Sequence, residues 1–369
     1  MPTPSPKRIL IVTACFGEGH NSAARNLALA LEEHGHIAIT EDPCLLGAPH
    51  ATRALRALYL AATTHSPKTW LALYRSTDRV DFNKRFPFMR QPELLLGQLV
   101  RDTRSDAVVC TYPLYPYFLD RLFAAGLPRL PVFTVVTDSI TINASWLRSK
   151  PDHWLVTDRH TREAMIAAGL DADRVVETGF PVHPSFARLP TIPADDPADP
   201  FRILYFPTSK RPHVRRIGSA LLEAGGARAQ LTIVLGRNFR KLYQKARQLE
   251  EAFPAQVVIK GWTQRVPELM CKHHLVVGKA GGATVHEALA ARCPMLVHHL
   301  VPGQEEGNLR LLERFGAGSL AVSQDEIRTA VRDLLADNAA NWRRMKHSLA
   351  TLTHRTGSSA AASFITTHC

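Results

Sequence analysis

The chain has 369 residues, of which 45% are hydrophobic and 21% are charged. This length predicts two globular domains, each able to bury its own core, and the composition argues against a disordered chain. The net charge of +12 favours an anionic ligand or an anionic membrane surface, although solubility alone would also explain it. A basic chain could also bind nucleic acid, but no helix-turn-helix, zinc-finger or RNP signature accompanies the charge. Nucleic acid is therefore a weaker interpretation than an anionic ligand or an anionic membrane.

The six cysteines show neither a CxxC pair nor the spacing of a metal site. This pattern fits a reducing compartment and argues against a disulfide framework and a zinc site. No apolar run reaches the roughly 18 residues that a membrane span needs. The chain also passes from Lys7-Arg8 directly into an apolar run, without a signal-peptide pattern, so we expect a cytoplasmic protein.

The first half of the chain predicts alternating strands and helices. Short, continuous apolar runs are typical of strands that are buried on both faces of a parallel sheet. The runs of this kind are 8–13, 107–110, 131–137 and 153–157. Helices are predicted at 22–34 and 161–168, where apolar residues recur at helical spacing.

The turn after the first strand carries a candidate catalytic histidine. Gly17 and Gly19 permit a tight turn, and Asn21 or Ser22 can cap the helix that follows. His20 stands at the start of this helix, where the positive end of the helix dipole favours the neutral imidazole that a general base requires. The same histidine could instead only bond to the backbone.

A carboxylate follows the run at 131–137. Asp138 would lie at the carboxyl edge of the sheet, where α/β folds bind their ligands. It could act in catalysis, or it could cap the next helix.

Residues 51–104 combine basic and aromatic side chains in a way that suits the surface of an anionic membrane. Such a stripe can equally be ordinary core beside a solvated face, and both interpretations stay open. The residues that we expect at a membrane are Trp70, Tyr74, Lys84, Arg85, Phe86, Phe88 and Arg90.

A stretch with four prolines and three aspartates, 189–200, interrupts the alternation and predicts a linker. The pattern restarts after it, with apolar runs at 203–206, 230–235, 256–259, 274–277 and 295–300. We therefore predict an α/β protein with two doubly wound, Rossmann-like domains facing a central cleft. The predicted parts are an N-terminal domain at 1–190, a linker at 191–200 and a C-terminal domain at 201–369, whose last helix could cross back to the N-terminal domain.

The segment 278–308 is the most informative part of the chain. Gly281 and Gly282 precede a predicted helix, and glycines there let backbone N–H groups and the positive helix end approach a phosphate. Glu287, one turn into the helix, is placed to bind a ribose diol. The loop after the next strand adds groups that bond to sugar hydroxyls, at Gln304, Glu305 and Asn308. Together these features predict a sugar-nucleotide site.

Seven short motifs occur in order along the chain, at 12–20, 135–138, 156–158, 177–182, 261–262, 278–284 and 302–305. Together they resemble those of the monogalactosyldiacylglycerol synthase and processive diacylglycerol glucosyltransferase family, which is similar to the peptidoglycan-precursor GlcNAc transferase. The resemblance implies a GT-B fold, a UDP-sugar donor in the C-terminal domain and a lipid acceptor beside the N-terminal domain. It also implies inversion at the anomeric carbon without a metal or another cofactor.

The resemblance implies roles for individual residues. His20 would activate the acceptor hydroxyl, and Glu287 would bind the ribose. The remaining donor contacts would be the pyrophosphate cradle of Gly281, Gly282 and Thr284, the uracil contact at Gly261 and Trp262, and the sugar contacts of Gln304 and Glu305.

The chain departs from the family in the loop after the first strand of the C-terminal domain. The family has a glycine-rich loop there, close to the phosphates, whereas residues 206–213 of this chain contain no glycine. Either the charges of Lys210 and Arg211 take over the contact with the anion, or the chemistry differs in detail. The family's acceptor pattern is met only loosely at 108–113, which leaves the identity of the acceptor open.

We therefore expect a transferase that moves a hexose from a UDP-sugar to a lipid, with diacylglycerol as the favoured acceptor, at the inner face of the cell membrane. The alternatives are a polyprenyl-linked or soluble acceptor on the same fold, and a UDP-sugar epimerase. The sequence does not identify the sugar.

Overall fold

The computed structural model describes residues 5–196, 199–352 and 356–369. Contacts within it divide the chain into two compact units. The first unit runs to Pro184 and also contains Val301–Gly307 and the residues from Thr356 to Cys369. The second unit contains Ser185–Leu300 and the described residues from Asn308 to 352.

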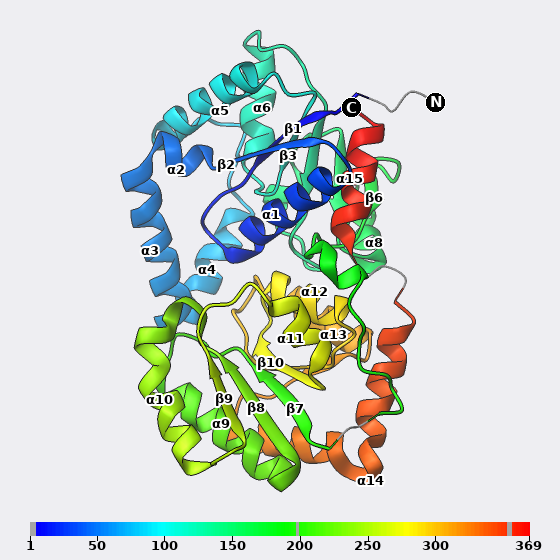
Figure 1. Cartoon of the computed structure of the whole chain (residues 1–369). Coiled ribbons are helices and arrows are strands. Elements are labelled where there is room, and N and C mark those ends of the chain that lie inside the picture. The colour runs from blue at the N-terminus through cyan, green and yellow to red at the C-terminus, as the bar shows by residue number, and fades with distance from the viewer. Residues whose placement is uncertain (1–4, 197–198, 353–355) are drawn as a thin grey trace. The chain divides into compact units, whose positions relative to one another are not determined.

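A parallel sheet of six strands forms the centre of the first unit. Its strands are β1 (Arg8–Val12), β2 (Ile37–Glu41), β3 (Ala107–Cys110), β4 (Val132–Val135), β5 (His153–Val156) and β6 (Val175–Glu177). They lie in the order β2-β1-β3-β4-β5-β6. Figure 1 labels β1, β2, β3 and β6 of this sheet. The side chains of β3 and β4 are buried throughout, as expected for strands in the middle of a sheet that is covered on both faces.

Helices connect these strands. They are α1 (Glu18–Glu33), α2 (Pro43–Gly47), α3 (Pro49–His65), α4 (Pro67–Thr77), η1 (Pro87–Met89), α5 (Arg90–Thr103), α6 (Tyr115–Ala124), α7 (Ala144–Leu147) and α8 (Arg159–Ala167). A proline stands at the start of α2, α3 and α4. Proline is favourable there because the first N–H groups of a helix have no partner within the helix.

The second unit repeats this design. Its strands are β7 (Phe201–Tyr205), β8 (Ala229–Val234), β9 (Val257–Lys260), β10 (Leu275–Lys279), β11 (Met295–His299) and β12 (Gly318–Leu320), in the parallel order β12-β11-β10-β7-β8-β9. Its helices are α9 (Arg211–Gly225), α10 (Phe239–Ala252), α11 (Val266–Lys272), α12 (Gly282–Ala290), α13 (Glu306–Arg314, from Asn308 on) and α14 (Gln324–Ala350), with short 3₁₀ turns η3 (Gly226–Arg228) and η4 (Gly236–Asn238).

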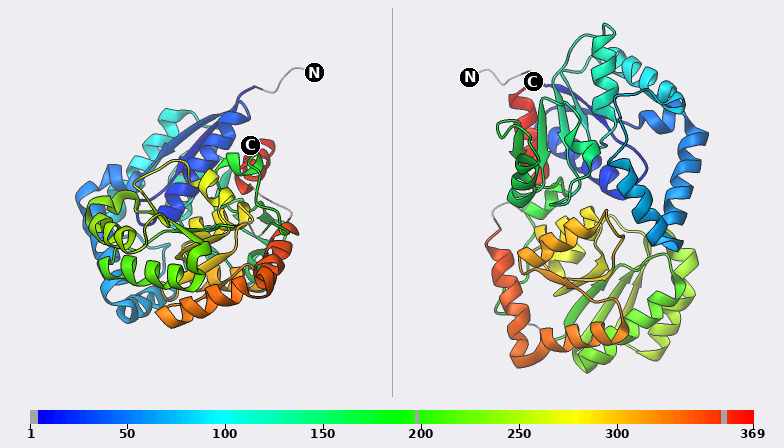
Figure 2. Two further views of the ribbon diagram at one scale, coloured as in Figure 1. Left: turned by 60° about the horizontal axis from the view of Figure 1, so that its bottom comes forward. Right: turned by 180° about the vertical axis from the view of Figure 1, so that it is seen from behind.

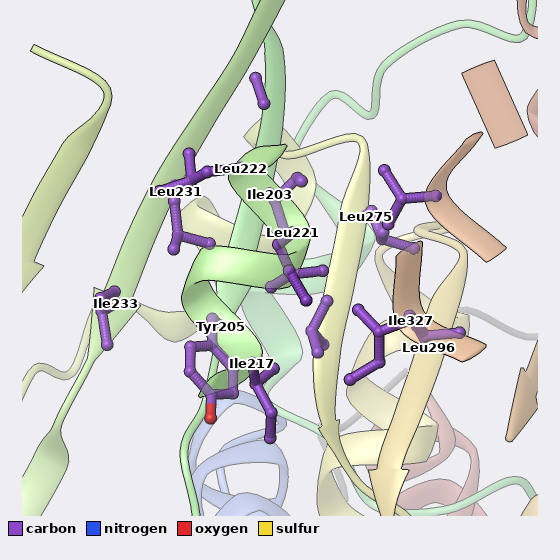
Figure 3. Packing of buried hydrophobic residues seen from close by; sticks show 14 of the residues in the cluster. Ile203, Tyr205, Ile217, Leu221, Leu222, Leu231, Ile233, Leu275, Leu296 and Ile327 are labelled. Carbon is purple, nitrogen blue, oxygen red and sulfur yellow. The ribbon is translucent and has the colours of Figure 1, made fainter. Parts of the chain in front are cut away.

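The core of the second unit lies between its sheet and the helices α9 and α14. Figure 3 shows Ile217 and Leu221 of α9 beside Ile203 of β7, with Leu275 of β10 and Leu296 of β11 next to them. All five side chains are buried. Each buried aliphatic side chain of this size stabilises the fold by about 1.5–3 kcal/mol.

The last helix, α15 (Gly357–Thr367), belongs to the first unit and packs against α1. The figures show it in red beside the first sheet (Figures 1 and 2). Near the end of the chain, the Lys7 Nζ atom donates a hydrogen bond of 2.8 Å to the carbonyl oxygen of Cys369. The first unit is thus built from three separate stretches of the chain.

The predicted α/β class with two doubly wound sheets is confirmed, and each predicted strand is present with its ends shifted by a few residues. The prediction missed β2, β6 and β12, three edge strands whose side chains are largely half-buried or exposed. Among the described residues, no helix is both long enough and apolar enough to cross a membrane.

Candidate functional site

His20 lies in the first turn of α1, close to the carboxyl end of β3. Its Nδ1 atom is 2.7 Å from the carbonyl oxygen of Thr111 and 3.0 Å from the hydroxyl of Thr137. Because a carbonyl oxygen can only accept a hydrogen bond, Nδ1 carries the proton and Nε2 keeps its lone pair. Burial lowers the pKa of His20 to about 4, so the imidazole is neutral at neutral pH and Nε2 can accept a proton.

The start of α1 differs in detail from the prediction. The helix begins at Glu18, and its N-cap is Gly17 rather than Asn21 or Ser22. Asn21 lies inside the helix, where its Oδ1 atom accepts a hydrogen bond of 3.0 Å from the Thr13 hydroxyl. Neither Gly17 nor Gly19 has a positive φ, so the turn does not need glycine for its backbone conformation. At Gly19, apart from its chain neighbours and its own helix backbone, no heavy atom of the described residues lies within 4 Å of the position that a Cβ would take.

Asp138 follows β4 by three residues. Its Oδ2 atom accepts a hydrogen bond of 2.8 Å from the indole N–H of Trp146. Burial raises the pKa of Asp138 to about 6, although the bond from Trp146 opposes this shift. The alternative that Asp138 caps the next helix is wrong, because Asn143 is the N-cap of α7.

His20 and Asp138 both line a cavity of about 510 Å³ in the first unit. Most of the lining is apolar, as is typical of pockets that bind hydrophobic ligands. Its apolar wall comes from the loop after β1, α3, α4, the segment 82–89 and the loop after β3: Phe16, Leu55, Leu58, Tyr59, Trp70, Leu73, Tyr74, Phe82, Phe88, Met89 and Tyr112. The polar groups at the cavity include those of Asn143, Ser145 and Gln304. The arrangement offers a proton acceptor at the side of an apolar pocket.

Among the residues predicted at a membrane, Trp70, Tyr74 and Phe88 line this cavity. The Trp70 ring lies 4.9 Å from the Tyr59 ring and 6.0 Å from the Tyr74 ring, measured between centroids. Phe88 is 52% exposed. The helix α4 and the 3₁₀ turn η1 therefore contribute to a wall of the pocket. The pattern of basic and aromatic residues in 51–104 did not predict this pocket.

The basic residues of the same segment lie on the surface. Lys84 and Arg90 are exposed, and Phe86 is half-buried. The Arg85 Nε atom lies 3.3 Å from the carboxylate of Glu93, which also pairs with Arg121 at 2.7 Å. Arg85 is thus partly neutralised by its own chain.

The predicted phosphate cradle lies in the second unit, at the start of α12. The helix begins at Gly282 with Gly281 as its N-cap, and no side chain in the described part of the chain caps it. The first backbone N–H groups of the helix therefore have no side-chain acceptor, as in helix ends that bind phosphate. Thr284 and Glu287 are half-buried in the same helix. The uracil contact predicted at Gly261 and Trp262 follows β9, where the Trp262 side chain is 61% exposed.

Lys210 is the N-cap of α9, directly after the loop that lacks glycine. Its side chain is half-buried. The Arg211 guanidinium, the other cation considered for this loop, donates a bond of 3.1 Å to the carbonyl oxygen of Lys241.

The loop after β11 holds the residues predicted to contact the sugar. The Gln304 Oε1 atom accepts a hydrogen bond of 3.0 Å from the Tyr59 hydroxyl, and both residues belong to the first unit. Glu305 is buried, and its carboxylate accepts a bond of 3.0 Å from the backbone N–H of Val301. Asn308, in the second unit, donates a bond of 3.0 Å to the carbonyl oxygen of Ala280 and so ties α13 to the turn before α12.

Comparison with known proteins confirms the resemblance seen in the sequence. Residues 20–182 match the family model described as monogalactosyldiacylglycerol (MGDG) synthase.

Two relatives share most of their length with this chain. The processive diacylglycerol beta-glucosyltransferase of Bacillus pumilus (strain SAFR-032) is 24% identical over 90% of this chain and 87% of its own length. The protein of the same description from Bacillus subtilis (strain 168) is 25% identical over 92% of this chain and 90% of its own.

The structural comparison shows the fold. The crystal structure of Acinetobacter baumannii MurG aligns with a TM-score of 0.60 and 16% identity, covering 98% of this chain and 100% of that one. The predicted GT-B fold is therefore confirmed.

Proposed function

We propose that this protein is an inverting glycosyltransferase that moves a hexose from a UDP-sugar to the free hydroxyl of diacylglycerol. The observation that carries the proposal is the apolar cavity of the first unit, whose lining includes His20 with its Nδ1 atom bonded to a carbonyl oxygen. A soluble sugar acceptor would gain little from a wall of leucine and aromatic side chains, whereas acyl chains would bury apolar surface there.

In this proposal His20 acts as the general base. Its Nδ1–H bond to the Thr111 carbonyl holds the ring in one orientation and one tautomer. Nε2 then takes the proton of the acceptor hydroxyl while the hydroxyl oxygen bonds to the anomeric carbon. The bond from that carbon to the UDP oxygen breaks on the opposite face, so the configuration inverts. UDP leaves with the electron pair of that bond.

The second unit would bind the donor. The N–H groups at the start of α12 would hold the diphosphate, and Glu287 would bind the ribose hydroxyls. Donor binding is proposed to need neither a metal nor another cofactor, since backbone N–H groups and basic side chains neutralise the phosphates. The related proteins named above carry diacylglycerol glucosyltransferase in their descriptions, which supports the proposed acceptor.

The protein would work at the cytoplasmic face of the cell membrane, where the acceptor resides. The exposed basic residues Lys84 and Arg90 and the exposed ring of Phe88 would contact the anionic leaflet beside the mouth of the pocket.

The test is a transfer assay with purified protein, UDP-glucose or UDP-galactose, and vesicles with or without diacylglycerol. We expect glycolipid only when diacylglycerol is present, with the anomeric configuration opposite to that of the donor. Transfer only to a polyprenyl-linked or water-soluble acceptor would overturn the proposed acceptor. Conversion of the UDP-sugar to its epimer without any acceptor would overturn the assignment as a transferase.

A further inference from the structure

The carboxyl edge of the second sheet carries a cluster of imidazole and ammonium groups, which comprises Lys210, His213 and His299. Lys210 and His213 follow β7, and His299 ends β11, while β10 lies between the two strands. The His213 ring lies 6.3 Å from the His299 ring, measured between centroids. The ring of His298, the buried neighbour of His299, lies 6.4 Å from the His213 ring, also measured between centroids.

His213 is held in place in the first turn of α9. Its Nδ1 atom is 3.3 Å from the Thr208 hydroxyl, and its carbonyl oxygen accepts a bond of 3.3 Å from the Tyr205 hydroxyl. The N-cap residue, Lys210, provides no side-chain cap. The positive end of a helix of 15 residues therefore adds to the charges of the cluster.

The cluster brings together basic groups that could interact with an anion. Burial, together with the charges of Lys210, His299 and Arg216, lowers the pKa of His213. Burial likewise lowers the pKa of His298 to about 4. The charges that act on His213 are all basic and disfavour its protonated form, so an anion bound here would counteract them and favour protonation.

A second observation points to a ligand. The Nδ1 atom of His298 is buried without a hydrogen-bond partner among the described residues, while its Nε2 atom is 3.4 Å from the carbonyl oxygen of Phe206. Buried polar atoms are nearly always paired in folded proteins. An unpaired nitrogen beside this group of basic side chains suggests a site whose hydrogen bonds are completed on binding.

The cluster shares its edge of the sheet with the phosphate cradle. A Cβ atom on Gly278 would lie 3.6 Å from Cγ2 of Thr284 and 3.9 Å from Cβ of Phe206. The start of α12 and the loop that leads to His213 therefore approach each other over Gly278, within one unit.

We propose that His213, supported by Lys210 and His299, takes up a proton when the donor diphosphate binds and holds it as an imidazolium. The charge would replace the contacts that a glycine-rich loop makes in the related family. This inference rests on the proposed function, since it takes the donor to be a UDP-sugar. It adds that the affinity for the donor depends on pH, through a group that takes no part in the reaction at the acceptor.

The direction of the pH dependence follows from the charge. An adjacent anion favours the protonated form, so the pKa of His213 is higher in the complex than in the free protein. The additional affinity is therefore complete below the pKa of the free protein and is lost as the pH rises through the pKa of the complex. Proton uptake on binding is largest between these two values.

Calorimetry with UDP-glucose, in the absence of acceptor, tests the proposal without relying on turnover. A diphosphate diester does not titrate near neutral pH, so changes in affinity report on the protein. We expect the wild type to bind roughly tenfold more tightly at about pH 5.5 than at about pH 8, the scale of one hydrogen bond to a charged group. In buffers of different ionisation enthalpy, the wild type should take up protons on binding.

Three variants make the test specific. His213→Asn keeps a polar group toward Thr208 but cannot become charged, so it should lose most of the proton uptake and bind with little pH dependence. His213→Lys, charged throughout the range, should retain the affinity and lose the pH dependence. His347→Asn, at an exposed position of α14, should behave as the wild type.

The outcomes separate this inference from the proposed function. Binding of UDP-glucose with unchanged proton uptake in His213→Asn would overturn the inference and leave the donor assignment intact. Failure of the folded wild type to bind UDP-glucose at any pH would overturn the proposed function as well. Uridine should bind without proton uptake, because it lacks the phosphates.

Discussion

Burial moves the two titratable groups of the apolar cavity in opposite directions. It lowers the pKa of His20 to about 4 and raises the pKa of Asp138 to about 6. The usual order of a histidine and an aspartate is thereby reversed. At neutral pH the histidine is uncharged and ready to accept a proton, and the aspartate is largely ionised and bonded to Trp146.

These shifts predict the acid side of the pH profile. A base must be unprotonated to act, so activity is present above its pKa and is lost as the pH falls through it. If His20 is the base, kcat/KM should stay level down to about pH 5 and fall near pH 4. A fall already near pH 6, which disappears in Asp138→Asn, would assign the role to Asp138 instead.

Removal of the His20 imidazole should lower the rate of transfer and leave the affinity for the donor unchanged. We expect His20→Ala to lower kcat by roughly 10²–10⁴-fold, the usual contribution of a general base. Binding of UDP measured by calorimetry should remain unchanged, because the start of α12 and Glu287, which are proposed to hold UDP, lie in the other unit. Turnover close to that of the wild type would contradict the role of His20.

For Glu287 we expect a change in the affinity for UDP. If its carboxylate accepts hydrogen bonds from the ribose hydroxyls, Glu287→Ala should weaken UDP binding by about 1.5–3 kcal/mol. Glu287→Gln should lose less, because one acceptor oxygen remains. Glu251→Ala, at the exposed end of α10, serves as the matched control in the same titration. Equal UDP affinity in all four proteins would show that α12 does not bind the ribose.

At the scale of elements, the segment from α3 to η1 lines the pocket with apolar side chains and also carries exposed basic residues such as Lys84. Leu58 and Leu73 are 63% and 53% exposed, although both line the cavity. The pocket is therefore open on the side where these helices meet solvent. An acyl chain could enter there from a membrane without crossing the rest of the unit.

This arrangement predicts electrostatic binding to anionic vesicles. Replacing Lys84 and Arg90 by Ser should weaken binding by up to about 2 kcal/mol, at about 1 kcal/mol for each group near the leaflet. Arg85 is left in place because it pairs with Glu93, so its loss would confuse charge with folding. A control variant with Arg314 and Arg332 changed to Ser removes the same charge from exposed positions of the second unit. Equal co-sedimentation of the three proteins would argue against this docking surface.

The sequence predicts some elements better than others for physical reasons. Buried strands such as β3 and β4 are recognisable because every side chain is apolar. The edge strand β2 was not predicted, because its side chains are half-buried or exposed and the strand does not need a continuous apolar run. The start of α1 was predicted at Ser22, since that residue type favours caps, but Gly17 takes this position without any side-chain bond.

The candidate site follows the same division. His20 and Asp138 were predicted together because the carboxyl ends of parallel strands share one edge. The wall of the pocket was not predicted, because Tyr59, Trp70 and Met89 come together only through packing of helices that are separated in sequence. The histidine cluster escaped for the same reason, since His213 and His299 are 86 residues apart in the chain, as their numbers show.

At the scale of the whole molecule, α15 is a part of the first unit that the chain supplies last. A Cβ atom on Gly357 would lie 2.2 Å from the backbone of Gly179, closer than real Cβ contacts. We expect Gly357→Ala to displace the start of α15 and to cost about 1–3 kcal/mol, the range for overpacking. Thermal unfolding should therefore begin several degrees lower, at roughly 2–4 °C per kcal/mol.

The control for this prediction is Ser363→Ala, on the exposed side of the same helix, which should unfold as the wild type does. An unchanged melting temperature in Gly357→Ala would mean that α15 contributes little to the stability of the first unit.

The return of α15 has a consequence for synthesis on the ribosome. Residues up to Pro184 emerge early, but the helix that packs on α1 follows only after the whole second unit has been translated. At the usual pace of translation this interval is on the order of ten seconds. During this interval, the face of α1 that later packs against α15 stays exposed to water. The nascent first unit must therefore wait for the last residues of the chain before its fold is complete.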